Sequence, residues 1–173
     1  MKKIKLALSM KEILGSGSKL TIFTDNKLKP IKNCNAFYYE DAMDNYMHSN
    51  LVAGMATVKI RFFTIYGTFE DRNVILHDSS YTEFPRYVKR FLIEHEIGHV
   101  KNGDLEMDPS KSKFAIIKRS FGILPKMEIK ADAYASAVVG NYNAKKALLF
   151  LRKRTDLPLI SKFELMRRYY KIK

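Results

Sequence analysis

Two histidines lie four residues apart in "FLIEHEIGHVKNGD", residues 91–104, and a glutamate follows the first of them. On an α-helix, residues four apart project from one face on successive turns. His95 and His99 can therefore bind one Zn²⁺ through a ring nitrogen each. Glu96 lies beside this pair, where its carboxylate can take a proton from a metal-bound water. The pattern predicts a zinc site with a general base, against the alternative of an ordinary helix that carries two histidines.

A two-histidine site needs a third protein ligand and an open position for water. The extended metzincin pattern does not supply it, because Asn102 and Leu105 stand where that pattern has a glycine and a third histidine. The remaining histidines, His48 and His77, lie upstream without a comparable context. A carboxylate is therefore the expected third ligand.

The segment "KMEIKADAYASAVVG", residues 126–140, offers the best candidate. Glu128 and Asp132 are four residues apart on a helix face that otherwise carries alanines. Buried without partners, each carboxylate would cost several kcal/mol. That cost is removed if Glu128 binds the metal and Asp132 accepts the free N–H of a ligating histidine. The alternative is a solvated stripe beside Lys126 and Lys130.

Three acidic residues that follow the histidine helix are rival third ligands, although the chain would have to turn back tightly to bring them to the metal: Asp104, Glu106 and Asp108. Gly98 lies inside the same helix, where glycine costs about 1 kcal/mol relative to alanine. A glycine there predicts that another segment approaches the metal face closely.

The elements that position these residues indicate an α+β fold, because strands are followed by several helices. Helical spacing of apolar residues predicts a helix over 2–14, and residues 41–56 lean helical. Further helices are expected up to Lys101 after "SSYTEFP", and over three later segments: 126–140, about 143–154 and 158–172. β-branched and aromatic residues predict strands within 19–25, 35–40, 57–69 and 74–78, with a turn at 70–73 and a long connection over 104–125.

The bulk properties fit one soluble domain that spans residues 1–173, with basic helices over 141–173. A single cysteine, Cys34, excludes an internal disulfide. We find no signal peptide and no transmembrane stretch in the sequence, which predicts a cytoplasmic protein. The net charge of +13 is interpreted first as a lysine-rich solvated surface.

Three segments resemble the M48 family of gluzincin metallopeptidases. "HEIGHVKNGD" resembles the active-site helix of that family, and "EIKADAYA" resembles its E-x-x-x-D helix. "NAF", residues 35–37, resembles a short upstream segment of these proteins. The resemblance implies a zincin-like fold, in which a small sheet or hairpin packs against the active-site helix and a second metal-ligand helix. It also places Glu128 as third ligand and Asp132 behind the histidines.

The resemblance implies a zinc-dependent endopeptidase that holds one Zn²⁺ and hydrolyses a protein or peptide with Glu96 as general base. Residues 73–78 are expected to form an edge strand that pairs with an extended peptide. Tyr134, Tyr142 and His77 are candidate oxyanion partners, and each has a structural role as its first interpretation. Metallopeptidases that cleave phage-type repressors, the ImmA/IrrE group, share H-E-x-x-H and a downstream acidic helix, and they are the alternative family.

Two further classes remain open. The net charge and the basic C-terminal helices, with tyrosines among their lysines and arginines, are also expected of a nucleic-acid-associated protein whose metal is not catalytic. A metallopeptidase fold that has lost its activity and binds proteins is the third class. The complete set of His95, Glu96, His99 and Glu128 speaks against that third class.

Overall fold

The computed structural model of the chain describes residues 4–9, 22–49, 54–63, 68–106, 126–157 and 159–173. Strands come first and helices follow, so the predicted α+β class is confirmed. The chain divides into two compact units, residues 1–83 and residues 84–173. The prediction of one domain stays a prediction.

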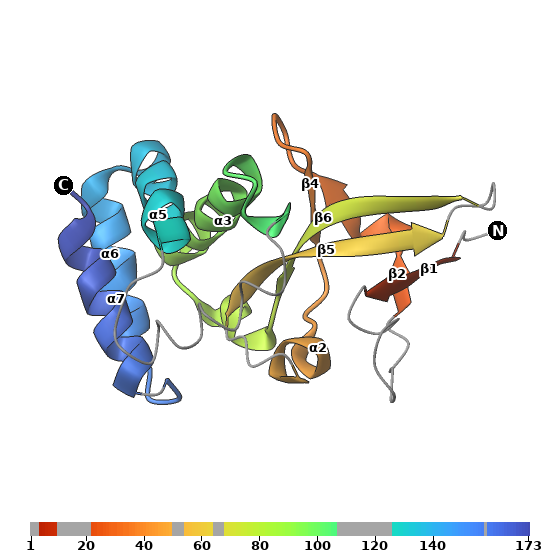
Figure 1. The fold of residues 1–173 in the computed structure, drawn as a ribbon. Coiled ribbons are helices and arrows are strands. Elements are labelled where there is room, and N and C mark those ends of the chain that lie inside the picture. The colour runs from red at the N-terminus through yellow and green to blue at the C-terminus, as the bar shows by residue number, and fades with distance from the viewer. Residues whose placement is uncertain (1–3, 10–21, 50–53, 64–67, 107–125, 158) are drawn as a thin grey trace. The chain divides into compact units, whose positions relative to one another are not determined.

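The first unit is a mixed β-sheet with strand order β2-β1-β5-β6-β4-β3. The β4–β6 pair is parallel, and the remaining pairs are antiparallel. Figure 1 shows the long β5–β6 hairpin crossing this unit. The strands are β1 (Ile4–Ser9), β2 (Ile22–Thr24), β3 (Leu28–Pro30), β4 (Ala36–Tyr39), β5 (Met55–Phe63) and β6 (Phe69–His77). Short helical segments connect them: η1 (Asp25–Lys27), α2 (Asp44–Ser49) and η2 (Ser79–Glu83).

The core of this unit forms on one face of the β5–β6 hairpin. Ile60 and Phe62 on β5 and Val74 and Leu76 on β6 are fully buried. Alternate residues of a strand point to the same face, so the two-residue spacing within each strand places these side chains together. They form one cluster with residues from the neighbouring elements: Leu28, Tyr39 and Met47.

Two predictions of secondary structure in this unit were wrong. Residues 4–9 form strand β1 rather than part of a helix, because large apolar residues in "IKLALS" alternate with polar or small ones with the two-residue period of a strand. Residues 10–14 of the expected helix lie outside the described residues. Residues 70–73 are not a turn but the outer part of β6, where Arg61 and Asp71 face each other across β5 and β6. Opposite charges in directly facing positions stabilise such a polar strand segment.

The expected edge strand over 73–78 was also wrong. Residues Asn73–Ile75 pair with β4 on one side and with β5 on the other. Their backbone hydrogen-bonding groups are therefore used within the sheet, and this part of β6 has no open edge for a peptide.

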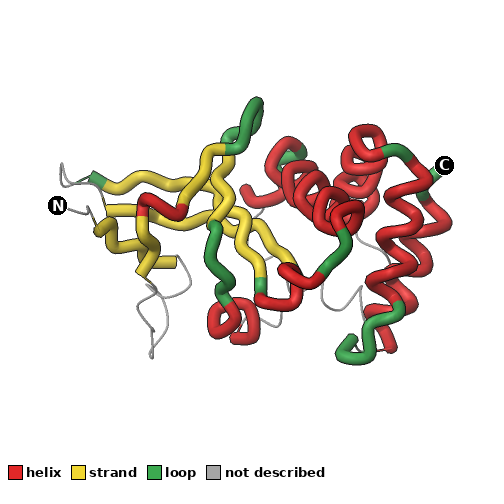
Figure 2. Tube along the Cα trace, turned by 180° about the vertical axis from the view of Figure 1, so that it is seen from behind, coloured by secondary structure: helices red, strands yellow, loops and turns green. Residues whose placement is uncertain are grey.

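The second unit contains four described α-helices, which cover the predicted helices to within a few residues. Figure 2 shows this unit as the group of red helices, with α6 and α7 side by side. Alanines are fully buried where the helices meet: Ala131, Ala135, Ala144 and Ala147. The helices are α3 (Arg86–Lys101), α5 (Lys126–Val139), α6 (Asn141–Arg152) and α7 (Leu159–Lys171), and η3 (Asp104–Glu106) follows α3.

Among the described residues, no helix is both long enough and apolar enough to cross a membrane. The connection expected over 104–125 begins with η3, and residues 107–125, which include Asp108, lie outside the described residues.

Candidate metal centre

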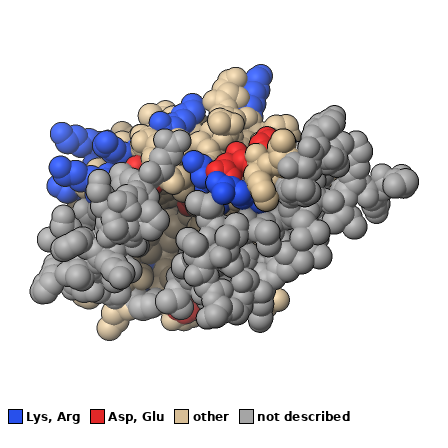
Figure 3. Space-filling model, turned by 45° about the vertical axis from the view of Figure 1, so that its right-hand side comes forward, with Lys and Arg blue, Asp and Glu red and all other residues tan. Residues whose placement is uncertain are grey.

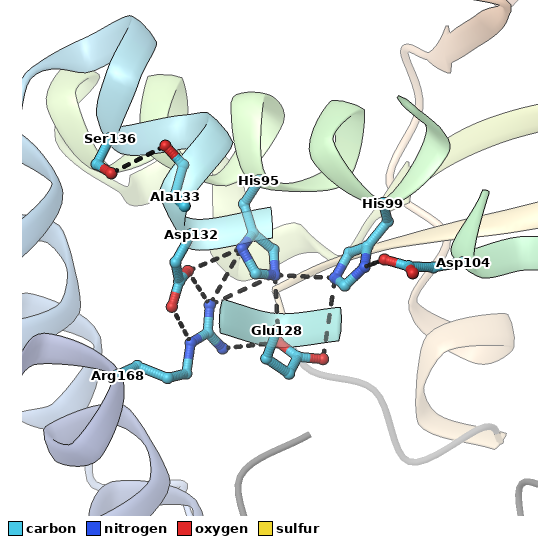
Figure 4. Close-up of polar contacts among 8 residues, drawn as sticks. All are labelled: His95, His99, Asp104, Glu128, Asp132, Ala133, Ser136 and Arg168. Carbon is cyan, nitrogen blue, oxygen red and sulfur yellow. Dashed lines mark hydrogen bonds and ion pairs between the residues drawn. The ribbon is translucent and has the colours of Figure 1, made fainter. Parts of the chain in front are cut away.

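Helix α3 positions both histidines of the H-E-x-x-H motif, and it begins directly after Pro85. Proline tolerates the start of a helix because its missing N–H would have no partner there. His95 and His99 project from consecutive turns, and their Nε2 atoms lie 3.1 Å apart (Figure 4). Glu96 follows His95 on the same helix and is 7% exposed. The helix therefore presents two imidazoles toward one point.

Helix α5 brings the third side chain to this point. Glu128 Oε2 lies 3.3 Å from His95 Nε2, and Glu128 Oε1 lies 3.8 Å from His99 Nε2. One ligand atom from each of the three residues lies within 4.8 Å of the others. The structure thus brings together the three residues that the sequence selected, although their role as metal ligands stays a prediction.

Gly98 determines how closely the two helices approach. A Cβ atom at Gly98 would lie 2.9 Å from Ala131 Cα and 3.1 Å from the Ala131 carbonyl oxygen on α5. Both are backbone atoms, so a side chain at this position would force the helices apart. The close approach that the glycine predicted is therefore present, and it lies one turn of α5 from Glu128.

A carboxylate lies behind each histidine. His95 Nδ1 donates to Asp132 Oδ1 at 2.9 Å, as expected from the sequence. His99 Nδ1 donates to Asp104 Oδ2 at 2.8 Å. When the single ring proton is on Nδ1, the Nε2 atom of each histidine has a lone pair that is available to a metal ion. Asp104 was expected only as a rival ligand, and instead it lies behind His99.

Gly103 makes the position of Asp104 possible. Its φ of +69° lies in the left-handed region, which glycine adopts without steric cost. The chain turns back there directly after α3 ends. Gly103 of "NGD" therefore provides the tight turn that brings Asp104 back toward the histidines.

Arg168 on α7 is the residue that the sequence analysis missed. Its Nε and Nη2 donate to the two oxygens of Asp132 at 2.7 and 2.6 Å, and its Nη1 lies 3.1 Å from Glu128 Oε2. Figure 4 shows the guanidinium between the two carboxylates. Its side chain is only 11% exposed. A local sequence pattern could not distinguish it from the other 30 lysines and arginines, since the chain has 31 in all.

The charges of this cluster are strongly coupled. Burial and the nearby Arg168 disfavour a charged His95, but hydrogen bonds to Asp132 and Glu128 prevail and raise its pKa from 6.5 to about 9. Burial opposes ionisation of Glu128, yet His95 and Arg168 hold its pKa well below 4.5. Burial likewise opposes ionisation of Asp132, and Arg168 and His95 lower its pKa. Two buried carboxylates therefore stay ionised, and they favour the protonated, positively charged form of His95.

This donor set fits a divalent metal ion. Two Nε2 lone pairs and one carboxylate face each other at distances where they repel unless a cation or a proton lies between them. Two histidines and one glutamate are a ligand set found in catalytic zinc sites. The carboxylates behind the histidines are the outer contacts that such ligands usually have.

The expected oxyanion candidates have other contacts. His77 belongs to the first unit, where its ring nitrogens contact the carbonyl oxygens of Asp78 and Glu40. The Tyr134 ring lies under the ammonium of Lys101 at 4.9 Å. Tyr142 on α6 is 76% exposed. Among the described residues we assign no oxyanion partner.

Among the described residues, the basic side chains visible in Figure 3 lie in several separate groups. Lysines and arginines are spread over several places there, and acidic side chains lie beside some of them. The segment "NAF" lies at the start of β4, where Ala36 is buried and the Asn35 carbonyl accepts a hydrogen bond from Asn73. Comparison of the chain with protein-family models, with curated proteins and with solved structures gives no significant match.

Proposed function

We propose that the chain is a zinc-dependent metallopeptidase with a zincin-like site, related to the gluzincins. The observation that carries this proposal is the convergence of His95, His99 and Glu128 from two helices, with ligand atoms within 4.8 Å of one another. A surface cluster of acidic and histidine side chains would not need a buried carboxylate behind each imidazole. The arrangement therefore supports a preorganised metal site rather than an accidental cluster.

The roles of the residues follow from their contacts. His95, His99 and Glu128 would hold Zn²⁺, which when bound supplies Lewis-acid activation of water for attack on a peptide carbonyl. Asp132 and Asp104 keep the proton of each imidazole on Nδ1. Glu96 takes a proton from the attacking water and passes it to the leaving amine.

Arg168 adds a fixed positive charge directly beside the ligands, because its Nη1 lies 3.1 Å from Glu128 Oε2 and its Nη2 lies 3.4 Å from His95 Nε2. It neutralises part of the charge of Asp132 and Glu128, so two carboxylates can lie close together in a buried place. It also orients Asp132 toward His95, because both Asp132 oxygens accept from the guanidinium. We propose that Arg168 positions the zinc ligands and does not contact the substrate.

Metal analysis of the purified protein beside its variants tests the proposal. We expect about one zinc per chain in the wild type and a sharp loss of zinc in Glu128→Ala. Glu96→Gln should keep its zinc and lose hydrolysis of an unfolded protein such as reduced casein. Stoichiometric zinc in Glu128→Ala would remove Glu128 from the ligand set, and retained turnover in Glu96→Gln would remove Glu96 from the role of base.

The nature of the substrate is proposed only as a class. A protein or peptide is the substrate that the motif implies, and a repressor cleaved in the manner of the ImmA/IrrE group is the alternative. The nucleic-acid alternative depends on the basic C-terminal helices, and Arg168 is not available to it, since its guanidinium is engaged in the cluster.

A further inference from the structure

The outward face of α7 carries large apolar side chains in an unusual arrangement. Leu159, Phe163 and Tyr170 are 74%, 70% and 72% exposed. With Met166, they recur every three or four residues and therefore follow one stripe along the helix. Arg168 points the opposite way, into the candidate metal centre. The helix thus buries a cation and exposes an apolar stripe.

Basic side chains border this stripe. On a helical wheel, Lys162 lies on one side of it, and Arg167 and Lys171 lie on the other. Arg152 and Lys153, at the end of α6, border a hollow of ≈ 450 Å³ whose apolar lining is Leu159, Phe163 and Met166. The acidic residue of α7, Glu164, lies on the side of Arg168, whose pKa it helps to raise.

We propose that this face of α6 and α7 binds an anionic membrane surface. An apolar stripe flanked by lysines and arginines is the arrangement of a helix that lies in the interface of a lipid bilayer. Clusters of about four to eight basic residues on such a helix attract anionic lipids, and each basic residue near the surface strengthens binding about fivefold. The apolar side chains would enter the boundary between headgroups and acyl chains, while the basic side chains would contact lipid phosphates.

Other occupants fit the surface less well. A second copy of the chain would bring the same basic border against itself across a two-fold axis, where like charges repel. A nucleic acid would contact the basic border but would leave the aliphatic side chains of the stripe, Leu159 and Met166, without a polar or aromatic partner. The remaining occupant, an acidic protein, is distinguished from lipid by the polyglutamate measurement below.

A single tryptophan tests this proposal directly, because the chain contains none. We would replace Phe163 by tryptophan, and as a matched control replace Tyr142, an exposed aromatic residue near the start of α6 that is not part of the stripe. With vesicles of phosphatidylcholine and phosphatidylglycerol, the emission of Phe163→Trp should shift to shorter wavelength, and that of Tyr142→Trp should not. An unshifted emission at residue 163, or equal shifts with vesicles of phosphatidylcholine alone, would overturn the proposal.

Removal of apolar side chains separates insertion from simple charge attraction. Phe163→Ser should weaken cosedimentation with anionic vesicles about tenfold, since a large apolar side chain is no longer buried. Tyr142→Ser should leave it unchanged, and equal zinc content in both variants would show that the helical unit is intact. Unchanged binding by Phe163→Ser would mean that charge alone attracts the vesicles. A blue shift of Phe163→Trp with polyglutamate and no lipid would assign the surface to an acidic protein instead.

The proposal is independent of peptidase activity. Loss of vesicle binding in a variant that keeps its zinc would concern only this surface. Loss of zinc in Glu128→Ala with unchanged vesicle binding would concern only the metal centre.

Discussion

Two arginine–aspartate pairs that each join two elements of this chain make the same two-pronged contact in different surroundings. Arg61 and Asp71 join β5 and β6 through two hydrogen bonds of 2.7 and 3.0 Å, and their side chains are 35% and 33% exposed. Arg168 and Asp132 join α7 and α5 through bonds of 2.7 and 2.6 Å, and their side chains are 11% and 4% exposed.

The difference shows that geometry alone does not determine how much such a pair contributes to stability. Water solvates each partner of the exposed pair when the other is removed, so the pair contributes little to the stability of the sheet. The buried pair leaves an uncompensated charge when one partner is lost, which costs about 3–5 kcal/mol. The buried carboxylate also accepts from His95, so it transmits the position of α7 to the candidate metal ligands.

The largest effect is expected for Arg168→Met. Removal of the guanidinium leaves Asp132 and Glu128 buried without their cation, so the free energy of unfolding should fall by about 3–5 kcal/mol in the presence of a chelator. Zinc should restore part of this loss, because the metal neutralises the same carboxylates. Urea unfolding with and without zinc measures both effects, with Arg61→Met as the matched control.

A loss of equal size in Arg168→Met and Arg61→Met would show that burial does not distinguish the two pairs. If Arg168→Met does not fold, Arg168→Lys provides the test. Lysine keeps the charge and loses the two-pronged contact with Asp132, so we expect a folded protein with weakened zinc affinity.

A smaller effect is expected when the carboxylates are exchanged for amides. Asp132→Asn keeps the shape of the side chain but weakens the hydrogen bond from His95, and zinc affinity should fall about 10- to 100-fold. Asp104→Asn should have a similar effect through His99. Asp71→Asn removes the same charge from the exposed pair and should leave zinc affinity unchanged. Competition with a zinc-binding dye gives the three values, and an unchanged affinity in Asp132→Asn would exclude its role behind the histidine.

The spacing of the helices around the buried pair should matter in a comparable way. Gly98→Ala places a methyl group against the backbone of Ala131, so the free energy of unfolding should fall by about 1–3 kcal/mol, together with zinc affinity. Ala131→Gly in the same chain should not restore either quantity, because the nearest atoms at residue 131 are backbone atoms. Recovery of stability and zinc affinity in the double variant would show that the methyl group at residue 98 clashes with the Ala131 side chain and not with its backbone.

The smallest effect is expected for the exposed pair. Arg61→Met should lower the free energy of unfolding only slightly, and high salt should reduce the difference. The hydrogen bond and charge of Arg61 lower the pKa of Asp71 below 3.8, despite slight burial. The stabilisation is therefore complete above pH 3.8 and is lost as the pH falls through the lowered pKa of Asp71. If the difference in free energy of unfolding between wild type and Arg61→Met stays constant through this pH range, the pair does not contribute to the pH dependence.

The residues that the sequence could identify are those whose relation is local. His95 and His99, and then Glu128 and Asp132, are each four apart on a helix, so their spacing alone places each pair on one face. Arg168 could not be identified, because it reaches the cluster only through the packing of α7. Asp104 was recognised as acidic and near, but its role depends on a backbone turn at Gly103 that brings it behind His99 rather than in front of it.

The fold was predictable to a similar extent. The helices of the second unit have start and stop signals at glycine, asparagine or proline, and they were confirmed. The errors fell in the sheet, where charged residues on β6 were interpreted as a turn. Facing residues on β5 neutralise those charges, and a single strand read by itself does not contain that information.

The separation of partners along the chain has a consequence for how this cluster assembles. The His99–Asp104 contact joins residues five apart, and it can form as soon as α3 and the turn after it exist. The Arg168–Asp132 contact joins residues 36 apart and must wait until α7 has docked. The carboxylate that orients His99 can therefore be in place early in folding, and the one that orients His95 is fixed late. We therefore expect high-affinity zinc binding during refolding only in molecules whose C-terminal helix has already docked. Zinc binding would then report the final step of assembly.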